Sequence, residues 1–173
     1  MSMASTVERY LHDSPTHFDL IDHPHTATAL QAAGVSHIPR EKMAKGVMLE
    51  DDSNHYVLAV LSATQKVEFD RLKEQMHRDF HLASEKRFRK CFADCERGAV
   101  PPFGAPYGVE TIWDEGLLNA GDLYFEAGDH ETLVHMKTSD FIRLLGDAQP
   151  FQFAAPADDA IPDRLWMDTD DSN

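Results

Sequence analysis

The sequence predicts an α+β fold built as one domain, and three observations favour it. The length of 173 residues is that of a single domain with its own hydrophobic core. Segments with the pattern of β-strands outnumber segments with the pattern of long helices. The two kinds of segment do not alternate regularly, so a doubly wound parallel sheet is disfavoured.

The first 62 residues are expected to form two helices and three strands. Apolar residues recur at helical spacing after Thr6, and Gly34 ends a second helical segment. Residues 17–22 alternate as a strand does, and two apolar runs flank the polar turn at residues 51–54, as in a hairpin. The expected helices are residues 6–13 and 26–33, and the expected strands are residues 17–22, 43–50 and 56–62.

The rest of the domain is expected to contain a loop between helical and strand segments. Residues 67–92 repeat apolar side chains with a helical period, which predicts two short amphipathic helices. Residues 98–108 hold six of the eighteen Gly and Pro residues, which predicts an ordered loop. The later patterns predict strands at 109–113, 123–127 and 132–137, a helical turn at 116–120 and a closing helix at 139–145.

The C-terminal residues differ from the rest of the chain. Residues 157–173 contain six acidic residues and one Arg, and they contribute −5 to the net charge of −14. We therefore expect one domain over residues 1–153 and an acidic, flexible tail over residues 154–173. Docking of this tail on the body would use Ile161, Leu165 and Trp166.

No targeting or membrane segment is expected. The longest apolar run is far shorter than the ~20 residues that cross a bilayer, and the N-terminus lacks the apolar core of a signal peptide. The two cysteines are expected to be reduced thiols. The expected location is the cytoplasm, without a membrane partner.

Three pairs of residues have the spacing of metal ligands. They are His23 with His25, His77 with His81 on an expected helix, and Cys91 with Cys95. No Glu follows His77 to complete a zinc-protease helix, and no second cysteine pair completes a tetrahedral site. Solvated or capping histidines and partly buried thiols are therefore expected, with no metal and no cofactor. A metal-dependent hydrolase that uses His77 and His81 is the weaker alternative.

Lys45 is the first of three features that point to a site. It opens the strand expected at residues 43–50, where Val47 and Leu49 share its face. If this face is turned to the core, the ammonium group is costly to bury unless an anionic ligand group pairs with it. The alternative is an exposed lysine at a strand end that reaches water.

The second feature is the stiff stretch at residues 98–104. Pro101 and Pro102 restrict the backbone and lack N–H groups, so other amides are the available donors for a carbonyl or an oxyanion. These amides belong to Gly98, Ala99, Val100, Phe103 and Gly104. The alternative is a rigid connector that packs Phe103 into the core.

The third feature is the sequence Gly128-Asp129-His130 in a short loop between two expected strands. A glycine at this point permits a tight turn that aims the imidazole of His130 sideways, where it can donate or accept a hydrogen bond. An ordinary hairpin loop is the alternative.

Together these residues resemble the family of YbaK proteins and prolyl-tRNA synthetase editing domains. Lys45 stands where the family has a lysine at a strand start, and Gly98-Ala-Val-Pro-Pro102 matches its Gly-x-x-x-Pro loop. Residues 123–130 match its strand that ends in Gly-x-His. The resemblance covers about residues 15–146 and implies a compact α+β fold with a central mixed, barrel-like sheet flanked by short helices.

The resemblance implies a hydrolase that acts in trans and deacylates tRNA mischarged with a small amino acid, such as Ala, Ser, Cys or Thr on proline tRNA. Lys45 would engage the phosphate or ribose of the terminal adenosine. Residues 98–102 would hold the aminoacyl carbonyl, and His130 would line the pocket that selects side-chain size. The neighbouring ribose hydroxyl would assist the attack of water. The other residues implied in substrate binding are Gly46, Phe103, Gly104, Gly128 and Asp129.

Several members of the family that edit small amino acids carry Asn directly after the lysine, whereas this chain has Gly46 at that position. A contact made by that Asn is not carried over, so the edited amino acid stays open among Ala, Ser, Cys, Thr and a nonprotein relative. The alternative function is a non-catalytic module that binds the tRNA 3′ end or a nucleotide.

The charge distribution fits contact with one end of a tRNA. The net charge of −14 argues against a broad basic face that coats duplex nucleic acid, so DNA is not an expected partner. Residues 86–90 form the one basic cluster, whereas residues 106–135 carry seven acidic residues and no Lys or Arg. The expected partners are the aminoacyl-tRNA 3′ end and an aminoacyl-tRNA synthetase that delivers it. A solvated helix face is the alternative explanation of the cluster.

Overall fold

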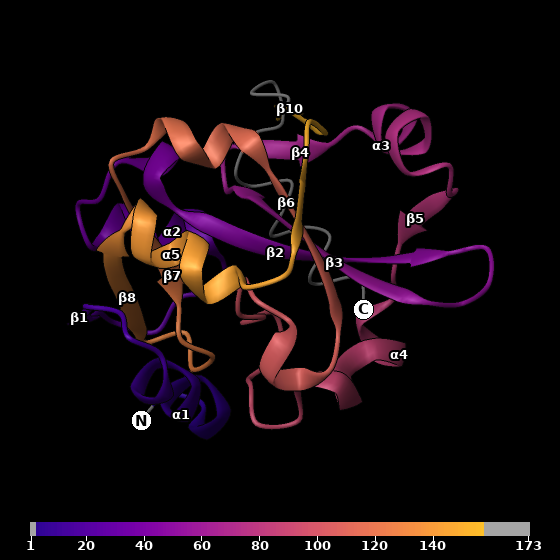
Figure 1. The fold of residues 1–173 in the computed structure, drawn as a ribbon. Coiled ribbons are helices and arrows are strands. Elements are labelled where there is room, and N and C mark those ends of the chain that lie inside the picture. Colours follow the sequence, from indigo (N-terminus) through magenta and orange to yellow (C-terminus); the bar gives the residue numbers. More distant parts are fainter. Residues whose placement is uncertain (1–2, 158–173) are drawn as a thin grey trace.

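The computed structural model describes residues 3–157, which form three sheets with helices around them (Figure 1). The largest sheet has the order β5-β2-β3-β6-β9, and a second sheet has the order β1-β8-β7. Strands β10 and β4 pair by themselves. The strands are β1 (Asp19–Asp22), β2 (Ala44–Asp51), β3 (Tyr56–Ser62), β4 (Gln65–Val67), β5 (Phe80–Leu82), β6 (Glu110–Asp114), β7 (Asp122–Glu126), β8 (Thr132–Lys137), β9 (Gln149–Phe151) and β10 (Ala154–Pro156).

Short helices connect these strands. The α-helices are α1 (Ser5–Asp13), α2 (Ala29–Val35), α3 (Phe69–Met76), α4 (Glu85–Phe88) and α5 (Thr138–Leu145). The 3-10 turns are η1 (Arg40–Lys42), η2 (Arg89–Phe92), η3 (Ala105–Tyr107) and η4 (Glu115–Asn119). Within residues 3–157, no helix combines the length and apolar character needed to cross a bilayer.

The large sheet is mixed, as predicted. Strand β2 is antiparallel to β3 and β5, whereas β6 is parallel to β3 and β9. A bridge between Met43 and Tyr124 connects the start of β2 to β7 and so joins the two larger sheets. The predicted α+β fold with a mixed, barrel-like sheet is therefore confirmed.

Both faces of β2 and β3 are buried, which explains their nearly continuous apolar sequences. Ala44 and Met48 face the main core, which also receives side chains from α1, β7, β8 and α5. Val47 and Leu49 face a second core cluster, to which α3 and β9 contribute. A third cluster lies under α2. This alternation places successive residues of β2 in different environments.

The hairpin and the closing helix form for the local reasons read from the sequence. The carboxylate of Asp51 accepts hydrogen bonds from the amides of Ser53 and His55, which fixes the turn between β2 and β3. Gly146 ends α5 with a φ of 57°, a conformation that favours glycine. The first turn of α1 is held by a distant residue, because Asp94 accepts from the Thr6 amide at 2.8 Å.

The prediction for residues 67–92 was partly wrong. Helices α3 and α4 are present, but Phe80 belongs to strand β5, which pairs with β2. His77 ends α3 in the left-handed conformation and His81 lies in β5, so these two histidines do not share a helix. Three residues of β5 are too few to show a period of two in the sequence.

The predicted domain boundary needs one correction. Residues 154–156, assigned to the tail from composition, form β10 and pair with β4. The Ala157 amide also donates to the Thr64 carbonyl, so the body extends to this residue. Residues 158–173, with the docking side chains named above, lie outside the described residues.

Candidate functional site

The start of β2 meets the proline-rich loop at Gly46. A Cβ atom at this position would lie 3.0 Å from the Pro101 carbonyl oxygen, 3.0 Å from Leu58 Cδ1 and 3.4 Å from Pro102 Cα. The loop backbone therefore occupies the space that a side chain would need. Two of the three predicted features, the strand start and the loop, are brought into contact.

Lys45 lies on the opposite face of β2 from this contact. Its side chain shares the face of Val47 and Leu49, as predicted, and it is half-buried. The ammonium donates to the Ala63 carbonyl at 3.4 Å, its only hydrogen bond within residues 3–157. Burial lowers the pKa of the Lys45 ammonium. A partly desolvated cation with one long hydrogen bond has capacity for an anionic or hydroxyl partner.

Three of the five amides predicted as donors already have partners. The Gly98 amide donates to Glu85 Oε1 at 2.6 Å, the Ala99 amide to the Glu96 carbonyl, and the Gly104 amide to Thr111 Oγ1. These bonds fix the loop at both ends.

The amides of Val100 and Phe103 have no hydrogen-bond partner in the part of the chain that the structure describes. They flank Pro101 and Pro102, which cannot donate. The Phe103 ring is buried and contacts Tyr10 and Phe125, with ring centroids 5.2 and 5.4 Å apart. The loop is thus a packed connector, and it also keeps two amide donors unused.

His130 contacts the first residues of the same loop. It is 3% exposed, and its Nε2 lies 2.6 Å from the Arg97 carbonyl oxygen, next to Gly98. Its Nδ1 lies 3.2 Å from Glu126 Oε1. Both partners are acceptors, so both ring nitrogens carry hydrogen and the ring is an imidazolium. The hydrogen bond to Glu126 accordingly raises the pKa of His130 to about 9.

Gly128 and Asp129 build the turn that presents His130. Gly128 has a φ of 98°, and a Cβ there would lie 2.8 Å from Ala4 Cβ. The carboxylate of Asp129 is buried and accepts from the amides of Glu131 and Thr132 and from the Thr132 hydroxyl. All of these bonds lie within the turn, so Asp129 supports the backbone that carries His130.

Several residues of this region were not found from the sequence. Glu126 and the Arg97 carbonyl hold His130, and Glu85 holds Gly98. The ring of His25 packs against that of His130, with ring centroids 5.3 Å apart. His25 Nε2 also lies 3.0 Å from Glu96 Oε2. Of these residues, only Glu126 could have been linked to His130 from the sequence, because it lies four residues before it. The other partners come from segments that the fold alone brings together.

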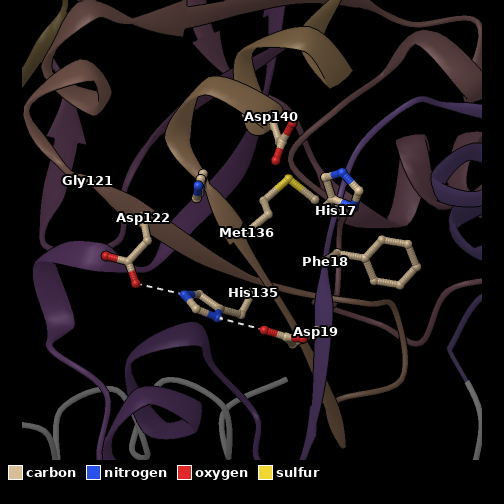
Figure 2. A pocket seen from close by; sticks show the side chains of 9 residues that line it. His17, Phe18, Asp19, Gly121, Asp122, His135, Met136 and Asp140 are labelled. Carbon is tan, nitrogen blue, oxygen red and sulfur yellow. Dashed lines mark hydrogen bonds and ion pairs between the residues drawn. The ribbon is translucent and has the colours of Figure 1, made fainter.

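An open cavity of about 720 Å³ lies elsewhere, between the end of β8 and the start of β1. His135 Nε2 lies 2.7 Å from Asp122 Oδ2, and His135 Nδ1 lies 3.6 Å from Asp19 Oδ2. Figure 2 shows the ring between these two carboxylates. Asp122 also pairs with Lys42. The cavity is lined by His17, Phe18, Asp19, Gly121, Asp122, His135, Met136, Lys137 and Asp140. None of the predicted site residues is among them.

The residue pairs with ligand-like spacing do not converge. Within residues 3–157, no group of three or more His, Cys, Asp or Glu side chains is arranged to hold a metal ion. His25 pairs with Glu96, and His81 lies 3.6 Å from Glu50. Cys91 and Cys95 are partly buried free thiols, as predicted.

Solved structures with the same fold were found by comparison. A candidate trans-editing enzyme for prolyl-tRNA synthetase has a TM-score of 0.72 and 18% identity, covering 89% of this chain and 99% of that chain. The hypothetical protein APE2540 has a TM-score of 0.77 and 17% identity, covering 87% and 100%. A candidate signal transduction protein from Marinobacter aquaeolei VT8 has a TM-score of 0.73 and 17% identity, covering 99% of this chain and 36% of that chain. Comparison with curated proteins gave no match.

A family model matches the chain directly. The model of the aminoacyl-tRNA editing domain matches residues 23–144, a span that includes Lys45, the loop at residues 98–104 and His130. The match covers well over half of the chain, and it confirms the resemblance inferred from the three motifs. The chain therefore belongs to the aminoacyl-tRNA editing domain family.

Proposed function

We propose that the protein is an aminoacyl-tRNA deacylase that acts in trans. The observation that carries the proposal is the loop at residues 98–104, which keeps the amides of Val100 and Phe103 unpaired in a chain of the editing family. The structural similarity to a candidate trans-editing enzyme for prolyl-tRNA synthetase supports action in trans.

The bond to be cleaved is the ester between the amino acid and a ribose oxygen of the terminal adenosine. Water attacks the carbonyl carbon, a C–O bond forms, and negative charge develops on the carbonyl oxygen. Amide donors that are fixed before the reaction stabilise this charge without reorganisation. The bond to the ribose oxygen then breaks, that oxygen takes a proton derived from the water, and the free amino acid leaves.

The neighbouring ribose hydroxyl of the substrate orients the water in this proposal. His130 does not act as the base, because Glu126 and the Arg97 carbonyl occupy both of its nitrogens. Its contribution is to hold the start of the loop in place. Any effect of His130 on the choice of amino acid then acts through the position of Gly98, against which its ring packs.

Lys45 supplies the positive charge that binds the phosphate or ribose of the terminal adenosine. Its long hydrogen bond to Ala63 leaves the ammonium free to bind a stronger acceptor. The Lys45 side chain extends from one face of the start of β2, and the loop contacts the opposite face. The terminal nucleotide is therefore proposed to lie across the start of this strand.

The substrate is proposed to carry a small amino acid, Ala, Ser, Cys or Thr, on proline tRNA. Next to Gly46, loop backbone fills the position where some relatives have an Asn side chain. This replacement changes the surface that the amino acid meets. Because one methylene group is worth only ~1–3 kcal/mol in a hydrophobic pocket, such a change is enough to alter which amino acid is accepted.

The direct test is to incubate the protein with proline tRNA acylated by each of the four amino acids and to follow loss of the ester. We expect accelerated hydrolysis of at least one of them, and a loss of turnover in Lys45→Ala. The exposed Lys66→Ala serves as a control with the same change of charge. If the folded wild type accelerates none of the four, the deacylase proposal is wrong.

The alternative is a module of the same fold that binds the tRNA 3′ end or a nucleotide without hydrolysis. Binding of tRNA that is weakened in Lys45→Ala, combined with no loss of ester in the wild type, would favour this alternative. Equal activity of the wild type and Lys45→Ala would remove Lys45 from the site.

A further inference from the structure

A basic surface lies beside the candidate site. Residues 86–97 hold five of the sixteen Lys and Arg residues of a chain whose net charge is −14. All five side chains are exposed. They are Lys86, Arg87, Arg89, Lys90 and Arg97. This concentration is not a consequence of composition and needs its own explanation.

The packing of α4 and η2 turns these charges outward. Phe88 and Phe92 are 7% and 3% exposed and belong to the main core, with their rings 6.4 Å apart. Two apolar side chains four residues apart anchor one side of the segment, so the residues between and around them face the solvent. The anchoring also excludes both rings from any stacking with a nucleic acid base.

Asp94 and Glu96, the acidic residues of the same segment, have partners within the chain, whereas most of the basic residues do not. Asp94 accepts from the Thr6 amide and the Tyr107 hydroxyl, and Glu96 pairs with His25. Arg87 pairs with Glu50 at 3.0 Å.

The remaining four cations have no ion pair or hydrogen bond of their side chains with any other residue between 3 and 157. They are Lys86, Arg89, Lys90 and Arg97, and we call them the basic surface. The positive charge of this surface is thus available to a ligand.

Two hydrogen bonds hold the segment of the basic surface beside the candidate site, one to the loop and one to His130. Glu85, the residue before Lys86, accepts from the Gly98 amide at 2.6 Å. The carbonyl of Arg97 accepts from His130. The segment that carries the basic surface is therefore held against the loop, and Arg97 directly precedes Gly98 in the chain.

We propose that the basic surface binds the backbone phosphates of the tRNA acceptor stem while the 3′ end occupies the loop. This inference rests on the proposed function. Exposed Lys and Arg side chains, next to the buried rings of Phe88 and Phe92, suit phosphates and not base edges, so the contact positions the RNA without reading its sequence. Residues 106–135 carry seven acidic residues and no Lys or Arg, so this part of the chain does not add to the attraction.

The test compares two triple variants with equal changes of charge. One is Lys86→Gln, Arg89→Gln, Lys90→Gln. The control neutralises three exposed cations on other elements, in the variant Arg9→Gln, Lys66→Gln, Lys137→Gln. Binding of deacylated proline tRNA and of a CCA trinucleotide is measured by fluorescence anisotropy over a range of salt concentrations. This measurement does not depend on hydrolysis.

We expect the first variant to bind tRNA at least ~10-fold more weakly than the control. Its plot of log affinity against log salt should also be less steep by ~2–3, since each duplex phosphate contact contributes about 0.9 to the slope. Binding of the trinucleotide should be the same in both variants. In deacylation assays the first variant should raise KM for whole tRNA and leave kcat unchanged.

If the two variants bind tRNA with equal affinity and equal salt dependence, the proposal that the basic surface binds tRNA is wrong, even if the wild type deacylates tRNA. The same conclusion follows if the wild type shows no salt-dependent binding of tRNA. Conversely, selective loss of tRNA binding in the first variant supports the proposed role of the basic surface in binding tRNA, even if no ester is hydrolysed. The outcome for the surface and the outcome for the proposed function are therefore distinguishable.

Discussion

The imidazole of His130 donates from Nε2 to the carbonyl oxygen of Arg97 at 2.6 Å, and this bond joins the turn after β7 to the residue that precedes the loop at residues 98–104. Its other nitrogen faces Glu126. In the neutral ring one nitrogen would direct its lone pair at an oxygen, so the geometry selects the cation. The other ionisable groups around the ring are His25 and Glu96, which pair with each other.

We expect the charge of His130 to stabilise the fold in a defined pH range. The pKa of His130 is raised from 6.5 to about 9 by Glu126. The stabilisation is fully present below pH 6.5 and is lost as the pH rises through about 9, because the unfolded chain binds fewer protons in this range. A shift of this size corresponds to roughly 3 kcal/mol. Urea unfolding of the wild type and His130→Gln between pH 6 and pH 10 measures it.

The difference in the free energy of unfolding between the two proteins should shrink as the pH rises. His130→Gln keeps a donor but cannot carry the charge, so its own stability should lack this pH dependence. A difference that stays constant from pH 6 to pH 10 would show that His130 is neutral in the folded protein.

Gly46 is expected to tolerate no side chain. In Gly46→Ala the new Cβ would meet the Pro101 carbonyl oxygen and Leu58 at 3.0 Å, so the loop or the strand has to move. Overpacking of this kind costs about 1–3 kcal/mol. Displacement of the loop should also lower kcat for deacylation. The measurements are urea unfolding and single-turnover hydrolysis.

Gly34→Ala is the matched control for this substitution. Gly34 lies in α2, and a Cβ atom added there would have no neighbouring atom within 4 Å, so an alanine should maintain or increase stability. Loss of stability in Gly34→Ala and not in Gly46→Ala would contradict the close approach of loop and strand.

The sequence predicted the parts of the site that depend on local patterns. The face of β2 on which Lys45 lies follows from the alternation of side chains along a strand. The ordered loop follows from its Gly and Pro content, whereas the packing of Phe103 was the alternative to a site of amide donors. The donors that remain free could not be predicted, because Glu85, Glu96 and Thr111 occupy three amides through contacts that only the folded chain creates. Short strands such as β5 and β10 were missed because three residues show no period.

Cys95 is expected to be unreactive although it is only partly buried. Burial raises the pKa of the Cys95 thiol to about 12, so very little thiolate is present near neutral pH. Its sulfur lies 3.3 Å from the Tyr107 hydroxyl and beside Gly128. Treatment of the native protein with iodoacetamide at pH 8, followed by mass spectrometry, should show far slower alkylation of Cys95 than in the urea-unfolded protein. Equal rates in the two states would contradict this expectation.

Glu85 is expected to affect catalysis more than stability. Its carboxylate accepts from the Gly98 amide at 2.6 Å, and Gly98 is exposed, so water can replace the acceptor when Glu85 is removed. Glu85→Ala should therefore cost less than about 1 kcal/mol of stability. The loop would lose a fixed position next to the reacting carbonyl, where small misplacements cost up to ~100-fold in rate. We expect a ~10-fold lower kcat in Glu85→Ala and a smaller loss in Glu85→Gln, which keeps an oxygen acceptor.

Glu74→Ala removes an equal charge from the exposed face of α3 and should leave kcat unchanged. If Glu85→Ala and Glu74→Ala have the same kcat, the bond to Gly98 does not position the loop for the reaction.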